Sequence, residues 1–315
     1  MRCLIRGDVA GWAFDRRSQA FAKYPPEGWL VASANNDFQC LDQEWDALFL
    51  LDCNASPLGY GDVKYARLVA SHTWITTYSP EDWRTRGCSE SKCISNVRRM
   101  LGKCNVVAVY NQAQREALDR ANVRQRIVLC PYSVDCAVFQ PAVREPREKI
   151  RCGWAFQVSG CDSFKGMSDV LVPLIAELGN EVEWDVLTPS QHSCLNADAM
   201  VRYLQNLDVF LCTSSGEGGP QGPFEAAACG AIPISTRVGQ MADWSELEQA
   251  RLIVPSYGNA TEAAETVRQM AARIRELVRD RETTEALSRY IVDNVRLRWN
   301  AEVECPKQLV ELFGN

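Results

Sequence analysis

The sequence predicts an α/β protein with two parallel-sheet domains. The chain has 315 residues, which exceeds the usual size of a single hydrophobic core. Its composition is that of an ordinary globular protein, with 46% hydrophobic and 23% charged residues. In both halves, short apolar runs alternate with helical patterns, and this alternation is typical of parallel sheets covered by helices on both faces.

In the first half, apolar runs such as "WDALFLLD" predict buried strands, and amphipathic stretches such as "NQAQREALDRAN" predict helices. We expect strands at residues 1–7, 28–34, 45–52, 65–71, 105–110 and 125–135, with helices at 12–24, 95–104 and 111–122.

The second half begins again after residues 139–149, where two prolines and mixed charges leave no apolar period. We expect strands at 149–156, 182–187, 208–213, 231–236 and 250–255, with helices at 168–179, 200–207, 224–230, 261–280 and 283–313. The first domain is therefore predicted at 1–140 and the second at 150–295. The final helix, 296–315, is expected to pack back onto the first domain.

Composition also excludes several classes of protein. No window contains eighteen uncharged apolar residues, and the N-terminal apolar run carries charges, so we expect a cytoplasmic protein without a signal peptide or membrane span. The fourteen cysteines are scattered, which favours reduced thiols in packing positions. Their spacing does not match zinc sites, and the only histidines are His72 and His192, so no metal is expected.

A glycine-rich segment, "TSSGEGGPQGPFEAAACG", carries the strongest functional signal. It follows a predicted strand and precedes a predicted helix, with Glu217 in the loop and Glu225 in the first turn of that helix. Loops beyond the carboxyl ends of parallel strands form ligand sites, and free backbone N–H groups at a helix start suit phosphate. An acid near a helix start also favours the helix dipole without any ligand, so a purely structural role for Glu225 stays open.

The same segment resembles the paired-glutamate signature of retaining group 1 (family 4-like) glycosyltransferases, which have the GT-B fold. "PYSVDCAVFQP" resembles the segment that ends the first domain in this family. "SFKGMSDVL" resembles its lysine-glycine donor element, and "VASHTW" places His72 where the family often has a cleft histidine. The resemblance implies two Rossmann-like domains with a cleft between them.

The resemblance also implies roles for individual residues. Glu225 would bind the ribose of a nucleotide-sugar donor, with a UDP-sugar expected, and Glu217 would hold the transferred sugar. Lys165 would neutralise the diphosphate, which backbone amides of Gly218, Gly219 and Gln221 would cradle. No metal or other cofactor would be required.

Two further expectations concern the donor. His72 would orient the donor sugar rather than act as a nucleophile. The family commonly carries an arginine shortly before the lysine, but "GWAFQVSGCDSFKG" has none after Arg151. Arg237, or Arg16 and Arg17, could supply this second positive charge.

Charge is the only indication of the acceptor. Residues 84–126 hold ten Lys and Arg against three Asp and Glu, although the whole chain has a net charge of −6. Such a segment is either a solvated basic face or a surface for an anionic acceptor. We favour DNA slightly over a membrane lipid or glycan, because no aromatic amphipathic helix is evident.

The model for this acceptor is a small phage-type enzyme that glycosylates hydroxymethylated pyrimidines, acting in the host cytoplasm if the protein is viral. Arg98 and Arg99 would then contact phosphates, and Trp74 and Trp83 would stack in the gap left by a flipped base. Two other classes stay open. One is a nucleotide-sugar epimerase, and the other is a non-catalytic nucleotide-sugar-binding protein.

Overall fold

The computed structural model describes residues 1–7, 13–35, 44–51, 65–72, 104–144, 147–156, 162–187 and 195–314, and of residues 65–72, 162 and 163 it describes the backbone alone. The chain forms two compact units. The first contains Met1–Asp135 and Trp299–Asn315, and the second contains Cys136–Arg298.

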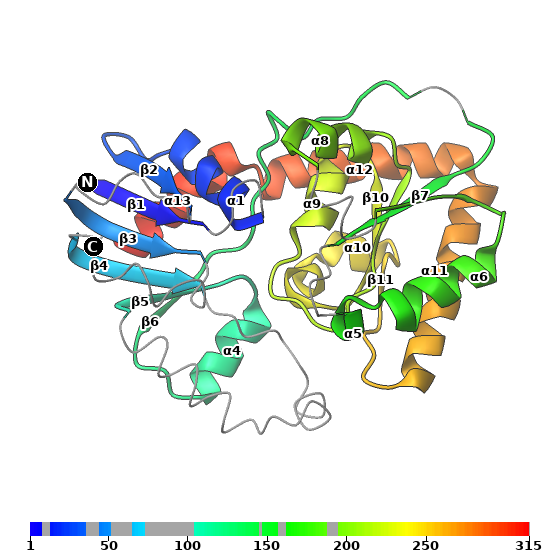
Figure 1. The fold of residues 1–315 in the computed structure, drawn as a ribbon, viewed down its shortest axis with the longest axis horizontal. Coiled ribbons are helices and arrows are strands. Elements are labelled where there is room, and N and C mark those ends of the chain that lie inside the picture. Colours follow the sequence, from blue (N-terminus) through cyan, green and yellow to red (C-terminus); the bar gives the residue numbers. More distant parts are fainter. Residues whose placement is uncertain are drawn as a thin grey trace. The chain divides into compact units, whose positions relative to one another are not determined.

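The first unit is built on a six-stranded, fully parallel sheet with the order β2-β1-β3-β4-β5-β6 (Figure 1). Its strands are β1 (Arg2–Arg6), β2 (Leu30–Ala34), β3 (Trp45–Leu50), β4 (Tyr65–His72), β5 (Val106–Val109) and β6 (Arg126–Leu129), and its helices are α1 (Ala13–Lys23), α4 (Gln112–Arg120) and α13 (Ala301–Phe313). Helices on both faces require apolar side chains on both faces of a strand. In β1, Cys3 and Ile5 enter one core while Leu4 enters another.

The C-terminal helix completes the core of the first unit. Phe49 of β3 lies edge-on between Phe21 of α1 and Phe313 of α13, with ring centroids 5.6 and 6.2 Å away. The predicted single helix over 283–313 is wrong in one respect, because it breaks before α13. Asn300 caps the new helix by accepting a hydrogen bond from the Glu302 N–H, so the chain can change direction there.

The second unit contains a five-stranded parallel sheet with the order β11-β10-β9-β7-β8. Its strands are β7 (Arg151–Ala155), β8 (Glu183–Leu187), β9 (Val209–Cys212), β10 (Ile232–Thr236) and β11 (Ile253–Val254). Its helices are α5 (Asp162–Lys165), the π-helix η1 (Met167–Leu171), α6 (Val172–Leu178), α8 (Ala197–Gln205), α9 (Gln221–Ala228), the 3₁₀ helix η2 (Gly239–Asp243), α10 (Ser245–Gln249), α11 (Ala260–Arg279) and α12 (Arg281–Arg298).

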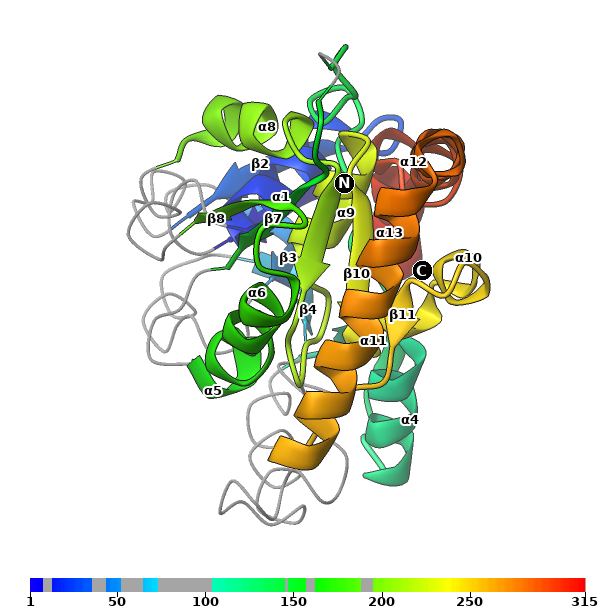
Figure 2. The same cartoon turned by 90° about the vertical axis from the view of Figure 1, so that its right-hand side faces the viewer.

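Right-handed crossovers explain how these helices are distributed. From β7 the chain passes outward to the edge strand β8, and it then returns across the sheet to β9 and β10. Because these crossovers run in opposite directions, α6 covers one face of the sheet, whereas α8 and α9 cover the other. Accordingly α6 packs with α11, whereas α8 and α12 pack with α9 (Figure 2). Both faces of β9 and β10 are buried as a result.

The structure confirms the α/β class and the alternating elements predicted in both halves. Residues 95–103 of one expected helix lie outside the described residues. No helix in the described ranges is both long and apolar enough to cross a bilayer.

Candidate functional site

The glycine-rich loop lies at the carboxyl edge of the second sheet. It leaves β9 at Thr213 and reaches α9 at Gln221, and the carboxyl ends of β7 and β10 flank β9 on its two sides. Because β9 is central and buried, the loop starts from a rigid base. This is the sheet edge at which parallel α/β domains bind ligands.

An ion pair occupies the middle of this edge. The Nζ atom of Lys165 lies 2.5 Å from Oε1 of Glu217, and the two side chains are only 15% and 11% exposed. The hydroxyl of Ser214 donates a second hydrogen bond, 2.8 Å long, to the same carboxylate oxygen. The lysine and the loop glutamate predicted from the sequence are therefore brought into direct contact.

Aromatic rings surround the lysine ammonium. Nζ of Lys165 lies 5.0 Å from the ring centroid of Phe156, at the end of β7, and 4.8 Å from that of Phe164. Such rings attract a cation through their negative faces. Phe156 lies nine positions before Lys165, in the stretch that has no arginine after Arg151.

The glycine after the lysine is required by the backbone. Gly166 has φ = 72°, and a Cβ atom on it would lie 2.0 Å from the carbonyl oxygen of Thr213. That contact lets the Thr213 hydroxyl donate to the Lys165 carbonyl at 2.8 Å, while the indole N–H of Trp154 donates to the Thr213 hydroxyl at 2.9 Å. The lysine-glycine element and the loop thus form one connected structure.

A second glycine supports the far side of the loop. Gly239 has φ = 49°, and a Cβ atom there would lie 2.4 Å from the carbonyl oxygen of Gly218. The backbone N–H of Gln240 donates to that same carbonyl at 3.0 Å. The loop backbone is consequently held against η2, which fixes the direction of the residues that lead into α9.

The start of α9 offers unused hydrogen-bond donors. Pro220 is the N-cap and gives no side-chain hydrogen bond to the helix. In the described part of the chain, the backbone N–H groups of Gly219 and Gln221 have no acceptor. The side-chain Oε1 of Gln221 is buried there without a hydrogen-bond donor. Unsatisfied N–H groups at a helix N-terminus, together with its dipole, favour an anion.

Glu225 is not in the first turn of its helix, as the sequence had suggested. The helix begins at Gln221 instead of Phe224, because Pro223 is tolerated in a first turn whose N–H groups need no intrahelical partner. Glu225 therefore begins the second turn, where its side chain is only 1% exposed. The simple dipole explanation for an acid at this position is weakened accordingly.

The site does not contain an activated thiol or a metal cluster within the described residues. Cys212 ends β9 beside the loop, but burial, reinforced by the charge of Glu217, raises the pKa of its thiol to about 11. The thiol is protonated at neutral pH and is a poor nucleophile. No group of three or more His, Cys, Asp and Glu side chains suited to a metal ion occurs in the part of the chain that the structure describes.

The other candidate residues lie apart from this cluster or outside the described residues. Arg237 follows β10 but forms an exposed ion pair with Glu248 of α10, at 2.5 Å. Arg16 lies in α1 of the first unit, and His72 ends β4, of which only the backbone is described. The predicted acceptor residues Arg98, Arg99, Trp74 and Trp83 lie outside the described residues.

The described end of the basic segment is partly engaged within the first unit. Arg126 donates a 2.6 Å hydrogen bond to the Leu312 carbonyl of α13, and Arg120 lies 4.0 Å from Glu116. These two arginines therefore make contacts within the first unit.

Comparison with known proteins agrees with this architecture. Residues 190–291 match the family model described as "Glycosyl transferases group 1", and this range includes both Glu217 and Glu225. The sucrose-phosphate synthase of Thermosynechococcus elongatus superimposes with a TM-score of 0.65 at 14% identity, over 99% of this chain and 98% of that one. Anabaena HepE in complex with UDP and glucose superimposes with a TM-score of 0.69 at 12% identity, over 100% and 99% of the two chains.

The chain has the GT-B fold. Staphylococcus aureus TarM, solved with fondaparinux, alpha-GlcNAc-glycerol and UDP, is a longer relative in structure, with a TM-score of 0.62 at 14% identity over 85% of this chain and 55% of that one. A search of curated proteins finds no match to the sequence. Residues 190–291 are thus similar to group 1 glycosyltransferases, and the likeness in fold extends over the whole chain.

The GT-B site contains residues that the sequence analysis did not select. Ser214 was missed although it lies three positions before Glu217, because a serine in a polar loop does not reveal its hydrogen-bond partner until the loop has folded. Phe156 and Phe164 were missed because an isolated aromatic residue gives no signal for its neighbour. Phe164 is the sequence neighbour of Lys165, whereas the contact with Phe156 depends on α5 and the end of β7 meeting in space.

Proposed function

We propose that this protein transfers a sugar from a UDP-sugar to a hydroxyl acceptor with retention of anomeric configuration and without a metal. The observation that carries the proposal is the loop between β9 and α9, which joins the Lys165–Glu217 pair to unused backbone donors. The group 1 match covers this loop, and the GT-B neighbour HepE is described in complex with UDP-glucose.

In this proposal the diphosphate replaces Glu217 as the partner of Lys165. Negative charge grows on the diphosphate as the glycosidic bond breaks, so a positioned ammonium group and the amides of Gly218, Gly219 and Gln221 would stabilise the leaving group. The aromatic rings around Lys165 restrict its side chain and limit the reorganisation that the exchange requires. The leaving phosphate would assist removal of the acceptor proton, since no nearby thiol is suited to covalent catalysis.

Glu217, once separated from Lys165, would accept hydrogen bonds from hydroxyls of the transferred sugar. Glu225 would accept hydrogen bonds from the ribose, which requires its buried carboxylate to become accessible to the donor. His72 would orient the sugar from the first unit. Arg237 and Arg16 are the candidates for a second positive charge on the diphosphate, and Arg237 would first have to leave Glu248.

For the acceptor we propose a hydroxymethylated pyrimidine in DNA, on the basis of the net charge of residues 84–126. Arg98 and Arg99 would contact the phosphates, while Trp74 and Trp83 would stack beside the flipped base. A lipid or glycan acceptor is the second candidate. It is favoured by the structural similarity to TarM, whose described complex contains alpha-GlcNAc-glycerol.

The donor experiment uses labelled UDP-glucose and a panel of other UDP-sugars, with product configuration determined by NMR. Hydrolysis or transfer with retention supports the proposal. Conversion of the donor into an epimer without an acceptor would establish the epimerase instead. Binding of UDP without any turnover across the acceptor panel would leave a binding protein.

The acceptor experiment offers hydroxymethylated duplex DNA, anionic lipid vesicles and soluble glycans to the same enzyme. Label in DNA alone supports the DNA assignment, and label in lipid or glycan alone contradicts it. If DNA is the acceptor, its binding should weaken with rising salt. The Arg98→Ala, Arg99→Ala double variant should reduce the slope of log affinity against log salt by the equivalent of about two phosphate contacts. A slope unchanged by the double variant would remove these arginines from the interface.

A further inference from the structure

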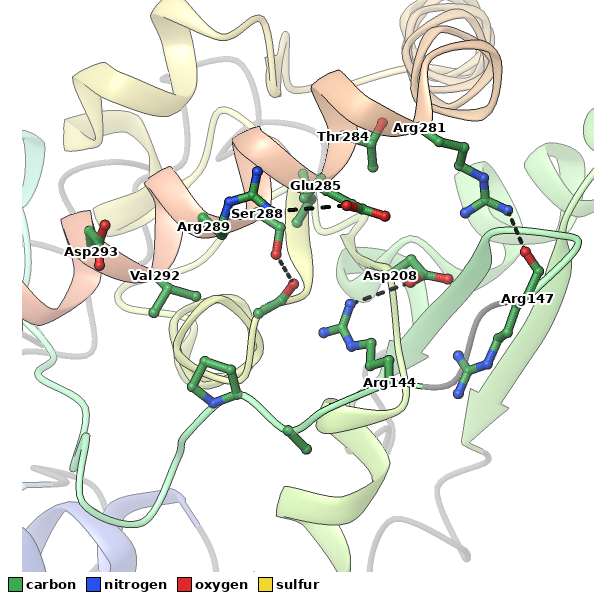
Figure 3. A pocket seen from close by; sticks show the side chains of 14 residues that line it. Arg144, Arg147, Asp208, Arg281, Thr284, Glu285, Ser288, Arg289, Val292 and Asp293 are labelled. Atoms are coloured by element: carbon green, nitrogen blue, oxygen red, sulfur yellow. Dashed lines mark hydrogen bonds and ion pairs between the residues drawn. The ribbon is translucent and has the colours of Figure 1, made fainter.

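A pocket of about 650 Å³ lies in the second unit away from the glycine-rich loop (Figure 3). Its walls are Pro141, Ala142, Arg144 and Arg147, the amino ends of β9 and β10, and one face of α12. The size falls in the range of pockets that hold small organic ligands. Asp208 precedes β9 and Thr213 follows it, so the strand places this pocket roughly 16 Å from the loop, at the opposite edge of the sheet.

Two arginines at one end of the pocket have no carboxylate partner among the residues that the structure describes. Arg147 donates to the backbone and side-chain oxygens of Asn206, and Arg281 donates to the carbonyls of Arg147 and Glu148. Within the described ranges neither guanidinium forms an ion pair. Neutral oxygens satisfy some of their N–H groups but do not balance their charge.

The carboxylate of Asp208 does not balance the charge of these two arginines. Arg144 is paired with Oδ1 of Asp208 at 3.3 Å, and Oδ2 of Asp208 accepts a hydrogen bond from the Arg151 N–H. Both oxygens of this carboxylate therefore already have a partner. Burial lowers the pKa of the Arg144 guanidinium, and the positive charge of Arg147 adds to that lowering while Asp208 opposes it. This end of the pocket therefore carries positive potential that the described carboxylates do not cancel.

The wall formed by α12 presents hydrogen-bond acceptors instead of positive charge. Ser288 donates its hydroxyl proton to the Gly230 carbonyl at 2.6 Å, and Thr284 donates to carbonyls of its own unit, so both hydroxyls present acceptor lone pairs. The carboxylate of Glu285 is only loosely paired, 3.9 Å from Arg289. Figure 3 shows Glu285 and Ser288 on the side of α12 that is turned toward Arg144 and Asp208, whereas the Thr284 hydroxyl points away from them. Acceptors on this wall suit a ligand that carries hydroxyl groups.

We propose that this pocket binds a small hydroxylated organic anion, with its phosphate or carboxylate group facing Arg281 and Arg147 and its hydroxyls along α12. The site is separate from the donor site and extends beyond the proposed transfer reaction. A sugar phosphate and a sugar acid share the required chemistry, and the experiment distinguishes them. Pro141 and Ala142 line one side of the pocket and would border the bound molecule there.

The test is calorimetry on the full chain with four probes, namely glucose 6-phosphate, gluconate, inorganic phosphate and glucose. We expect one of the first two to bind at one molecule per chain and more tightly than inorganic phosphate or glucose. The identity of the tighter probe assigns the anionic group. No binding of either hydroxylated anion up to about 10 mM, or equal binding of inorganic phosphate, would overturn the proposal.

Variants locate the binding. Arg281→Gln and Arg147→Gln should each weaken it by about tenfold, because each removes a charge-assisted hydrogen bond. Arg268→Gln on α11 is the matched control, since this exposed arginine pairs with Glu265 outside the pocket and its loss should leave the affinity unchanged. Ala142→Trp should block the pocket from an exposed position without removing a buried contact.

A probe with a phosphate group could instead occupy the proposed donor site. Lys165→Ala removes the cation of that site and should leave binding at the pocket intact. Binding that disappears in Lys165→Ala and persists in both Arg281→Gln and Ala142→Trp would place the anion at the glycine-rich loop and refute the second site. Because this control is independent of turnover, it gives an answer even if the transferase proposal fails.

Discussion

Each unit contains a parallel sheet covered by helices, but the cation that lies at the carboxyl edge of the sheet has different partners in the two units. In the second unit, Lys165 meets the carboxylate of Glu217 at the carboxyl edge of the sheet. In the first unit, Arg17 lies beyond the carboxyl ends of β5 and β6 and is only 1% exposed. It donates to the carbonyls of Cys130 and Pro131, and within the described residues it has no carboxylate partner.

This difference separates a site that can exchange partners from one that holds the chain in place. Removing either charge of an ion pair leaves an unpaired charge, but an incoming anion can replace the carboxylate. Arg17 has no such partner to replace. It stacks 4.8 Å from the ring centroid of Tyr110, and Gln308 of α13 donates to the same Pro131 carbonyl at 3.0 Å. Arg17 therefore ties α1 to the chain segment that also contacts α13.

The largest effect is expected for Glu217→Gln. Turnover should fall by about 100-fold, because a carboxylate that accepts hydrogen bonds from the sugar contributes more than a neutral amide. The affinity for UDP should be unchanged or higher, since Lys165 loses its internal anion. Kinetics and calorimetry measure the two quantities, with Glu181→Gln as a control in the same unit. A parallel loss of turnover and UDP affinity would contradict the exchange of partners.

Lys165→Met should weaken UDP binding by about thirtyfold and leave uridine binding unchanged, because only UDP carries the diphosphate. Methionine preserves contact with the rings of Phe156 and Phe164. Lys149→Met is the matched control, since among the described residues this lysine donates a hydrogen bond to the Asn180 carbonyl alone. If the two ligands weaken equally, Lys165 supports the loop and does not contact phosphate.

Glu225→Gln should weaken UDP and uridine alike, by about tenfold, because both ligands contain the ribose that this residue would bind. The change preserves the shape of a side chain that is 1% exposed, and thermal unfolding checks that the unit is intact. Glu265→Gln on α11 is the control. An effect on UDP alone would move Glu225 from the ribose to the diphosphate region.

Arg17→Met should lower the free energy of unfolding by about 1–2 kcal/mol, because the Cys130 carbonyl loses its buried donor. UDP affinity should not change. Chemical denaturation and calorimetry separate these outcomes, with Lys23→Met as a partly exposed control in α1. A change in UDP affinity at unaltered stability would make Arg17 a ligand-binding residue and remove the contrast between the units.

The smallest effect is expected for Arg237→Ala, which should change UDP affinity by less than about twofold. Its exposed pair with Glu248 contributes little, and Arg237 has no described contact with Lys165 or Glu217. A tenfold loss measured by calorimetry would instead identify Arg237 as the second diphosphate cation. Glu248→Gln controls for loss of the surface pair itself.

The α/β class followed from the sequence alone, because apolar strand patterns alternate with amphipathic helix patterns. Both patterns are local signals that need no distant partner. The glycine-rich loop with Glu217 stood out because a strand, a loop and a helix start follow one another directly in the chain, whereas Lys165 was selected only through the resemblance of "SFKGMSDVL" to the family's lysine-glycine element. The helix start was misplaced by three residues, because Pro223 resembles a break although a first turn accommodates it.

Only the tertiary structure decided which of these groups meet. Lys165 and Glu217 are 52 positions apart, and their contact depends on β7 and β9 being neighbours in the sheet, with Gly166 fitted against the Thr213 carbonyl. The pocket beside α12 has the same origin, because Arg147, Asp208 and Arg281 come from three separate segments. Local patterns specify the elements, whereas charges that neutralise each other across strands depend on sheet order and packing.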